Sequence, residues 1–94
     1  MTLDEYRRSL AALDEQIIDL IAQRQGIAAE IGRIKHRDAL PIHDEAQHVQ
    51  VLGRVFDSAV EHKIDPVSVQ RAFEILIAMS EDRQHECAGE GNLP

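Results

Sequence analysis

The chain has 94 residues, a formal net charge of −7 and a single cysteine, so it is short, acidic and unable to form an intrachain disulfide or a cysteine-based metal site. The negative charge and the scarcity of aromatic residues argue against a surface for nucleic acids or anionic membranes, and no glycine-rich phosphate loop is present. No apolar run approaches the ~20 residues of a membrane span and the N-terminus lacks a signal-peptide pattern, so we expect a cytoplasmic protein.

The first predicted helix is long, from residue 3 to about residue 36. It begins with a capping-box pattern, in which Thr2 is followed three residues later by Glu5. Apolar residues then recur in alternating steps of three and four, which is a heptad repeat. We call the resulting apolar face the α-helical seam; it consists of Leu3, Tyr6, Leu10, Leu13, Ile17, Leu20, Ile27, Ile31 and Ile34. Arg24 occupies the one position of the repeat that is not apolar.

Two shorter helices follow in the chain. The carboxylate of Asp44 can cap a second helix that runs to about His62. Its predicted apolar face consists of Val49, Leu52, Phe56, Ala59 and Val60. Asp65-Pro66 is a strong start signal for a third helix, which we expect to end near Glu86. No segment alternates between polar and apolar residues as a strand does, so we predict an all-α fold of three helices.

The length of the first helix predicts an oligomer. A helix of this length spans about 50 Å, whereas a compact chain of this size has a radius of gyration near ~13 Å. Its own chain cannot cover the seam, so we predict an intertwined homodimer in which two long helices pack along each other and the shorter helices fold back onto both. Residues 1–86 form the predicted domain, and residues 87–94 a flexible tail without function.

Two cations mark the same side of the long helix. Arg24 stays charged even when buried, so it needs an anionic partner, which is either a carboxylate of the protein or a ligand. Lys35 lies eleven residues further on, close to three full turns, and about 16 Å away. A small organic acid fits between two such side chains, although a solvated lysine is the ordinary alternative. Arg7 is ~25 Å from Arg24 along the helix, so it can join a site only from an antiparallel partner chain.

The third predicted helix offers neutral polar groups. Phe73, Ile77, Ser80 and Gln84 share one stripe, and the stripe becomes polar at its end. Taken singly, Ser80 can equally bond its own backbone and Gln84 can face solvent.

Metal and nucleophile chemistry are not predicted. His43 and His48 are five residues apart, which is poor spacing for two ligands on one helix face, and no cysteine or third histidine completes a set. Asp14-Glu15 and Glu81-Asp82 are interpreted as outward acidic faces, and no serine, histidine and aspartate arrangement emerges. We therefore expect an anion-binding site without a metal or cofactor.

The chain from Arg7 to Gln84 resembles the AroQ class of chorismate mutases, which are small all-helical intertwined dimers. The resemblance rests on residues at the family's spacing in all three helices: Arg7, Leu13-Asp14-Glu15, Arg24, Lys35, Asp44, Ile64-Asp65, Phe73, Ser80 and Gln84. Each match is weak alone, and their order across three helices makes the resemblance specific.

The resemblance implies an isomerase of the shikimate pathway and aromatic amino acid biosynthesis that rearranges chorismate to prephenate without a covalent intermediate. Such an enzyme folds its dianionic substrate and stabilises the charge that grows on the breaking ether oxygen. By resemblance, Arg24 and the partner subunit's Arg7 hold the two carboxylates with help from Ser80. Lys35 and Gln84 then donate hydrogen bonds to the ether oxygen.

The family pattern fails next to Asp44, whose backbone N–H is implied to meet the ring hydroxyl. The family has an arginine and a glutamate where this chain has Gln47 and His48. The glutamate normally accepts a hydrogen bond from the ring C4 hydroxyl, so its replacement bears on the identity of the substrate. A neutral His48 nitrogen can accept the same bond, and Gln47 can contact a carboxylate.

Three alternatives stay open. Relatives of the same fold act as isochorismate pyruvate lyases or as 4-amino-4-deoxychorismate mutases, and these activities differ around the ring substituent. The third alternative is a non-catalytic helical dimerisation module. The presence of Arg24, Lys35 and Gln84 argues against that module.

Overall fold

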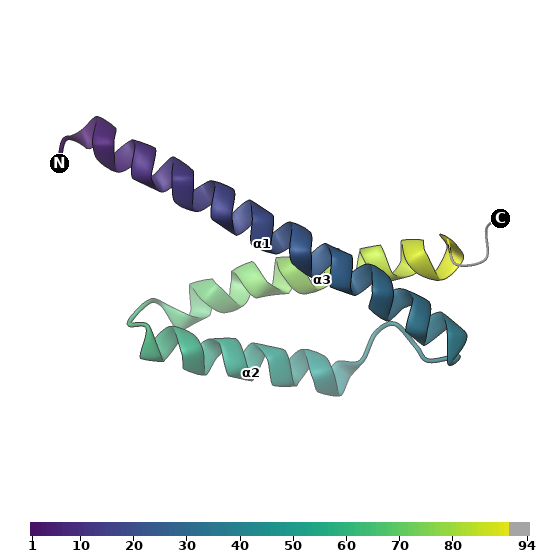
Figure 1. The fold of residues 1–94 in the computed structure, drawn as a ribbon. Helices are drawn as coiled ribbons and strands as arrows, with labels where there is room; N and C mark the ends of the chain where they lie inside the picture. Colours follow the sequence, from purple (N-terminus) through teal and green to yellow (C-terminus); the bar gives the residue numbers. More distant parts are fainter. Residues whose placement is uncertain (91–94) are drawn as a thin grey trace.

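The computed structural model describes residues 1–90, with side chains for residues 1–88. Within this range the chain forms three helices and no strand: α1 (Leu3–Arg37), α2 (Glu45–Glu61) and α3 (Pro66–Glu90), shown in Figure 1. The all-α prediction with a long first helix is confirmed. None of these helices combines the length and apolar character needed to cross a membrane.

Each helix begins at the predicted cap. The side chains of Thr2 and Asp44 each accept a hydrogen bond from the backbone N–H three residues on, at 3.1 Å. Asp65 accepts bonds from the two backbone N–H groups at the start of α3, both at 3.3 Å. The Ser68 hydroxyl and these N–H groups hold the pKa of the Asp65 carboxyl below its ordinary value. Local sequence therefore fixes where the three helices start.

Helix α3 extends beyond its predicted end near Glu86. It continues to Glu90, and Cys87 on its last turns is fully buried. Cys87 follows Gln84 by three residues, so it shares the face of α3 that packs on α1. The boundary of the predicted tail consequently moves, because residues 87–90 are helical, and residues 91–94 lie outside the described part of the chain.

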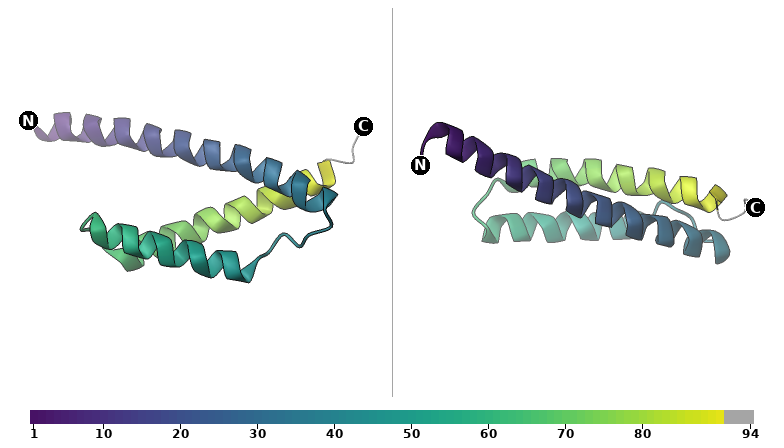
Figure 2. Two further views of the ribbon diagram at one scale, coloured as in Figure 1. Left: turned by 60° about the horizontal axis from the view of Figure 1, so that its bottom comes forward. Right: turned by 45° about the horizontal axis from the view of Figure 1, so that its top comes forward.

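Helix α3 holds the fold together through packing contacts with both other helices. It packs against both α1 and α2, whereas α1 and α2 do not contact each other within the described residues. In Figure 1 the C-terminal half of α1 crosses α3 while its N-terminal half projects beyond both other helices, and the two views in Figure 2 agree. The radius of gyration is 16.6 Å, compared with about 13 Å for a compact chain of this length.

The single chain has a small core. Its buried apolar residues are Ala28, Ala29, Val55, Ala59 and Cys87. In contrast, the seam residues of α1 remain between 37% and 63% exposed. Exposed apolar surface of this extent is unusual on a soluble monomer, so the fold leaves a face to be covered.

Candidate active site

One cavity of about 430 Å³ is lined by residues of all three helices and of the loop between α1 and α2. A volume of this size suits a small organic ligand. Seven of the eight residues predicted to form the site line it, namely Arg24, Lys35, Asp44, Gln47, His48, Ser80 and Gln84. Apolar side chains complete the wall: Ile31, Ile42, Val51 and Ile77.

Lys35 and Gln84 form a hydrogen-bonded pair across α1 and α3. The Lys35 ammonium donates to the Gln84 side-chain oxygen at 2.9 Å and to the Ile42 carbonyl at 2.6 Å. The Gln84 amide nitrogen donates in turn to the Ser80 hydroxyl at 3.3 Å. An ammonium has three N–H groups and a side-chain amide has two, so one donor of each residue is left for a ligand in the cavity.

Gly32 allows this pair to form. A Cβ atom on Gly32 would lie 2.6 Å from the carbonyl oxygen of Gln84 and 2.8 Å from its Cα. The two backbones therefore touch one turn before Lys35, and only a residue without a side chain fits there. From the sequence, Gly32 could be recognised only as a glycine that weakens a helix locally.

Arg24 lies on the cavity wall without an acidic partner. Its guanidinium donates to the Leu76 carbonyl at a long 3.4 Å and stacks over the Phe73 ring at 5.7 Å. No carboxylate among the side chains of residues 1–88 lies within ion-pair distance of it. This excludes an ion pair with the described carboxylates as the explanation of Arg24 and leaves its charge without a counter-ion among the described residues.

Arg7 is the one predicted site residue that the chain does not bring to the cavity. It lies on the projecting half of α1, where its side chain is 68% exposed and 3.7 Å from the carboxylate of Asp4. An exposed pair of this kind holds the guanidinium weakly.

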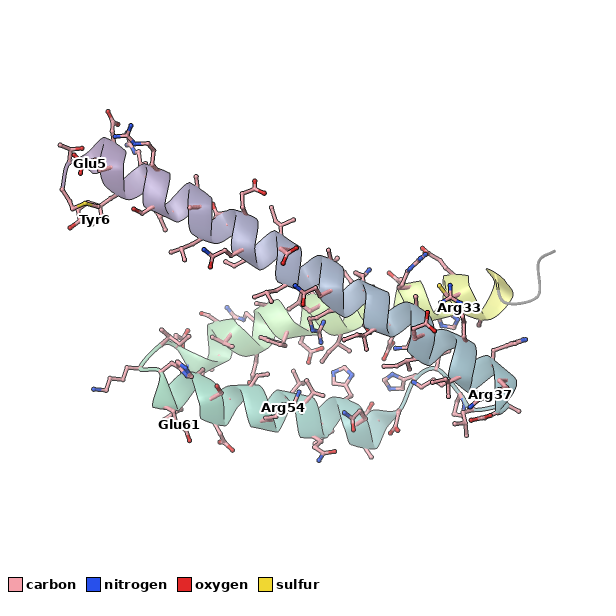
Figure 3. All side chains as sticks on the ribbon, in the orientation of Figure 1. Glu5, Tyr6, Arg33, Arg37, Arg54 and Glu61 are labelled. Atoms are coloured by element: carbon pink, nitrogen blue, oxygen red, sulfur yellow. The ribbon has the colours of Figure 1, made fainter. Side chains whose placement is uncertain are left out.

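Arg54 is a cavity-lining residue that was not predicted from the sequence. It lines the cavity from the middle of α2, where Figure 3 labels it, and it makes no hydrogen bond or ion pair with the described side chains. It follows Gln47 by seven residues and Val51 by three, so the three residues share one stripe of α2. This spacing could have indicated from the sequence that Arg54 lies on the same side of α2 as Gln47.

His48 points one ring nitrogen at Glu74 and buries the other. Its Nε2 lies 3.0 Å from a Glu74 carboxylate oxygen. Its Nδ1 is buried and has no hydrogen-bond partner among the described residues. A buried nitrogen without a partner is costly, so Nδ1 is open to a further contact.

His43 and Glu81 meet beside His48. The Nδ1 and Nε2 atoms of His43 lie 2.8 Å from carboxylate oxygens of Glu81 and Glu45, and these two carboxylates raise the pKa of His43. The interpretation of Glu81 as an outward residue was wrong, because its side chain is 30% exposed and lines the cavity. The spacing argument about the histidines does not apply either, since His43 precedes α2 and only His48 lies on the helix.

The site combines three cations with oriented hydrogen-bond donors. Arg24, Lys35 and Arg54 surround a volume suited to a small molecule, and Lys35 and Gln84 supply free N–H groups. Such an arrangement can bind a small acid with more than one carboxylate and can stabilise negative charge on an oxygen between them.

Comparison with known proteins agrees with this chemistry. The chain matches the family described as chorismate mutase type II over residues 6–85. It is 31% identical to a chorismate mutase of Methanocaldococcus jannaschii over 75 residues, which cover 80% of this chain and 76% of the relative. It is 30% identical to the bifunctional chorismate mutase/prephenate dehydratase of Escherichia coli over 76% of this chain, but it spans 18% of that longer protein. A 4-amino-4-deoxychorismate mutase of Streptomyces pristinaespiralis is 26% identical over 98% of this chain and 71% of its own length. The chain therefore belongs to the chorismate mutase type II family of the AroQ class, a family of isomerases.

Proposed function

We propose that this protein catalyses the rearrangement of chorismate to prephenate. In this reaction the enolpyruvyl group leaves the ring oxygen and forms a carbon–carbon bond across the ring, so no enzyme nucleophile takes part. The protein has to hold the dianionic substrate in its folded shape and to stabilise the charge that develops on the breaking ether oxygen.

The ether oxygen is assigned to Lys35 and Gln84. Their 2.9 Å hydrogen bond fixes two donors side by side, and each residue keeps an unused N–H. This pair is the single observation that carries the proposal, because it offers donors to one oxygen atom in a partly buried site. Electrostatic stabilisation of this type usually contributes more to catalysis than any other single effect.

The two carboxylates are assigned to guanidinium groups. Arg24 lacks an acidic partner on the cavity wall and takes one carboxylate, with the Ser80 hydroxyl beside it. The other carboxylate is assigned to Arg7 of a second copy. Arg54 adds a third guanidinium from α2, on the stripe where Gln47 stands in place of the family's arginine.

A homodimer is part of the proposal. The apolar seam of α1 is exposed along the half that projects from the chain, and Arg7 lies on that same half. A second copy that packs antiparallel along α1 covers the seam and carries its Arg7 to the middle of the first α1. One partner would therefore cover the exposed seam and also supply the second arginine of the site.

A second candidate is the mutase reaction of 4-amino-4-deoxychorismate. It is favoured by the coverage of the Streptomyces relative, which extends over 98% of this chain. It is also favoured by the ring-facing position, where His48 replaces a glutamate and Glu81 lies beside it. A ring amino group offers N–H donors to both side chains.

A parallel assay with chorismate, isochorismate and 4-amino-4-deoxychorismate tests the proposal. We expect loss of chorismate absorbance and, after acid treatment, formation of phenylpyruvate. Turnover of the amino substrate alone would favour the second candidate, and salicylate with pyruvate from isochorismate would establish the lyase. No turnover of any of the three would contradict an enzymatic role and favour the dimerisation module.

The role of Arg54 is tested in the same assay. We expect Arg54→Ala to raise KM about tenfold, the effect of losing one charge-assisted hydrogen bond. Arg71→Ala is the matched control, because Arg71 is an exposed arginine on α3 that does not line the cavity. Equal kinetics of the two variants would remove Arg54 from the site.

A further inference from the structure

We propose that His43, His48 and Glu81 form a binding site for a divalent transition-metal ion, best matched by Zn²⁺. The proposal goes beyond the proposed isomerase activity and does not depend on it. A bound ion would take the His48 and Glu81 atoms that are offered above to a ring amino group, so it would compete with the second candidate substrate at this position. One ring nitrogen of each histidine and one carboxylate oxygen of Glu81 lie within 4.8 Å of one another. The three residues come from the loop before α2, from α2 and from α3, so only the fold brings them together.

His48 presents a nitrogen that is ready to bind a metal. Because Glu74 accepts a hydrogen bond from Nε2 at 3.0 Å, the proton of the neutral ring belongs on Nε2. The lone pair then lies on Nδ1, which is buried and has no partner among the described residues. A metal ion satisfies that nitrogen, whereas the protein alone does not.

His43 is oriented in the same way. Glu45 lies 2.8 Å from its Nε2, and Glu81 lies 2.8 Å from its Nδ1. When a metal ion takes the place of the proton between Nδ1 and Glu81, Glu45 still accepts a bond from Nε2. Each histidine thus has an outer carboxylate of its own, which is the arrangement that fixes the ring orientation of metal-bound histidines.

Two imidazoles and one carboxylate are a ligand set typical of zinc. In a tetrahedral zinc site the ligand atoms are about 3.5 Å apart, so the cluster has to contract slightly from its present spread. His43 is 51% exposed and Glu81 30% exposed, which leaves both side chains room to move. Three protein ligands leave a fourth position for water or another small ligand. Since His48 and Glu81 line the cavity, the ion would form part of its wall.

Calorimetric titration with ZnCl₂ tests the site directly. The full chain is stripped with a chelator and titrated at about pH 8, where most imidazoles are deprotonated. We expect one Zn²⁺ per chain, with affinity weakened at least tenfold by His43→Ala and by the isosteric Glu81→Gln. The outer-carboxylate variant Glu74→Gln should weaken binding roughly tenfold.

His62→Ala is the matched control, because His62 caps the opposite end of α2, about 21 Å from His48. Zinc should raise the thermal midpoint of the wild type and of this control, and not that of Glu81→Gln. Circular dichroism verifies folding of each variant. If His43→Ala does not fold, the zinc affinity of Glu81→Gln alone tests the proposal. Absence of zinc uptake, or uptake that is equal in wild type and Glu81→Gln, would overturn the proposal and leave the cluster as an ion-pair network.

Discussion

The two halves of α1 follow one heptad repeat, but only the C-terminal half packs against the rest of its own chain. In the C-terminal half, Ala28, Ala29 and Gly32 are buried against α3. In the N-terminal half no residue is buried, and Leu10 and Ile17 are 60% and 54% exposed. None of the three buried residues belongs to the apolar seam, and the seam residues of the same half, such as Ile27 and Ile34, stay 62% and 44% exposed. The heptad repeat therefore did not indicate the face of α1 that packs on its own chain, and it leaves the seam along the whole helix to be covered from outside.

The same division separates the cations of the site. Lys35 and Arg24 lie on the half that folds onto its own chain, and both line the cavity. Arg7 lies on the half that projects away from it. If a second copy completes the site, variants in the C-terminal half should lose contacts made within one chain. Variants in the N-terminal half should lose the dimer or the partner's arginine.

The largest effect is expected in the folded half, from Lys35→Ala. Loss of a donor to a developing negative charge should lower kcat by roughly 100- to 1000-fold. The loss should appear in kcat as well as in kcat/KM, because the bond strengthens in the transition state. Steady-state kinetics with chorismate measure it, and Lys63→Gln, which removes the other lysine, is the control. An unchanged kcat in Lys35→Ala would refute the ether-oxygen role.

Arg7→Ala and Arg24→Ala together test whether one site uses both halves of α1, each from a different chain. Each variant should lose about 100-fold in activity, because each removes a charge-assisted bond to a carboxylate. If the site is shared, mixing the two inactive variants should restore about one quarter of wild-type activity, since half of the dimers then carry one intact site. Activity is measured after unfolding and refolding of the mixture together. Failure to recover activity, with dimers present, would place Arg7 outside the site.

The projecting half is tested by Ile17→Glu. In the single chain Ile17 is exposed, so the substitution would change the stability by no more than about 0.5 kcal/mol. In a homodimer it introduces a charge into a buried seam, so we expect monomers and a loss of several kcal/mol. Light scattering after gel filtration gives the mass, and thermal unfolding gives the stability. Ala12→Glu is the control, because Ala12 is exposed and lies seven residues from both Glu5 and Asp19, on the polar side of the same helix. It should behave as wild type, and equal behaviour of the two variants would contradict the dimer.

The local part of the fold was predictable from the sequence. Caps at Thr2, Asp44 and Asp65 depend on the residue and the few amides that follow it, and all three helices begin there. The face that a short helix buries was harder to predict. In α2 the predicted apolar face included Val49, which is 61% exposed, and omitted Val55, which is 7% exposed.

The site residues also divide into those that one helix predicts and those that depend on how the helices pack. The spacing of Lys35 from Arg24 is a property of one helix, so the sequence contains it. Arg54 and Glu81 enter the cavity because α2 and α3 pack with particular faces inward, and that information is absent from either helix alone. Arg24 can now be distinguished from a structural salt bridge, because the structure shows every described carboxylate to be out of reach.

The smallest expected effect compares two glycines within α1. Gly32→Ala places a methyl group 2.6 Å from the Gln84 carbonyl oxygen, so α3 must move away and stretch the 2.9 Å bond from Lys35. Overpacking against a backbone costs about 1–3 kcal/mol, and we expect kcat to fall several-fold, as measured by steady-state kinetics.

Gly26→Ala is the matched control, because nothing lies within 4 Å of its added methyl group. It should keep its kcat and gain up to about 1 kcal/mol of helix stability, visible as a higher thermal midpoint. The helix propensity gained is the same in both variants, so the difference between them isolates the contact with Gln84. Equal kcat values would mean that the close approach of α1 and α3 serves packing alone, and that the Lys35 and Gln84 donors tolerate a shift of α3.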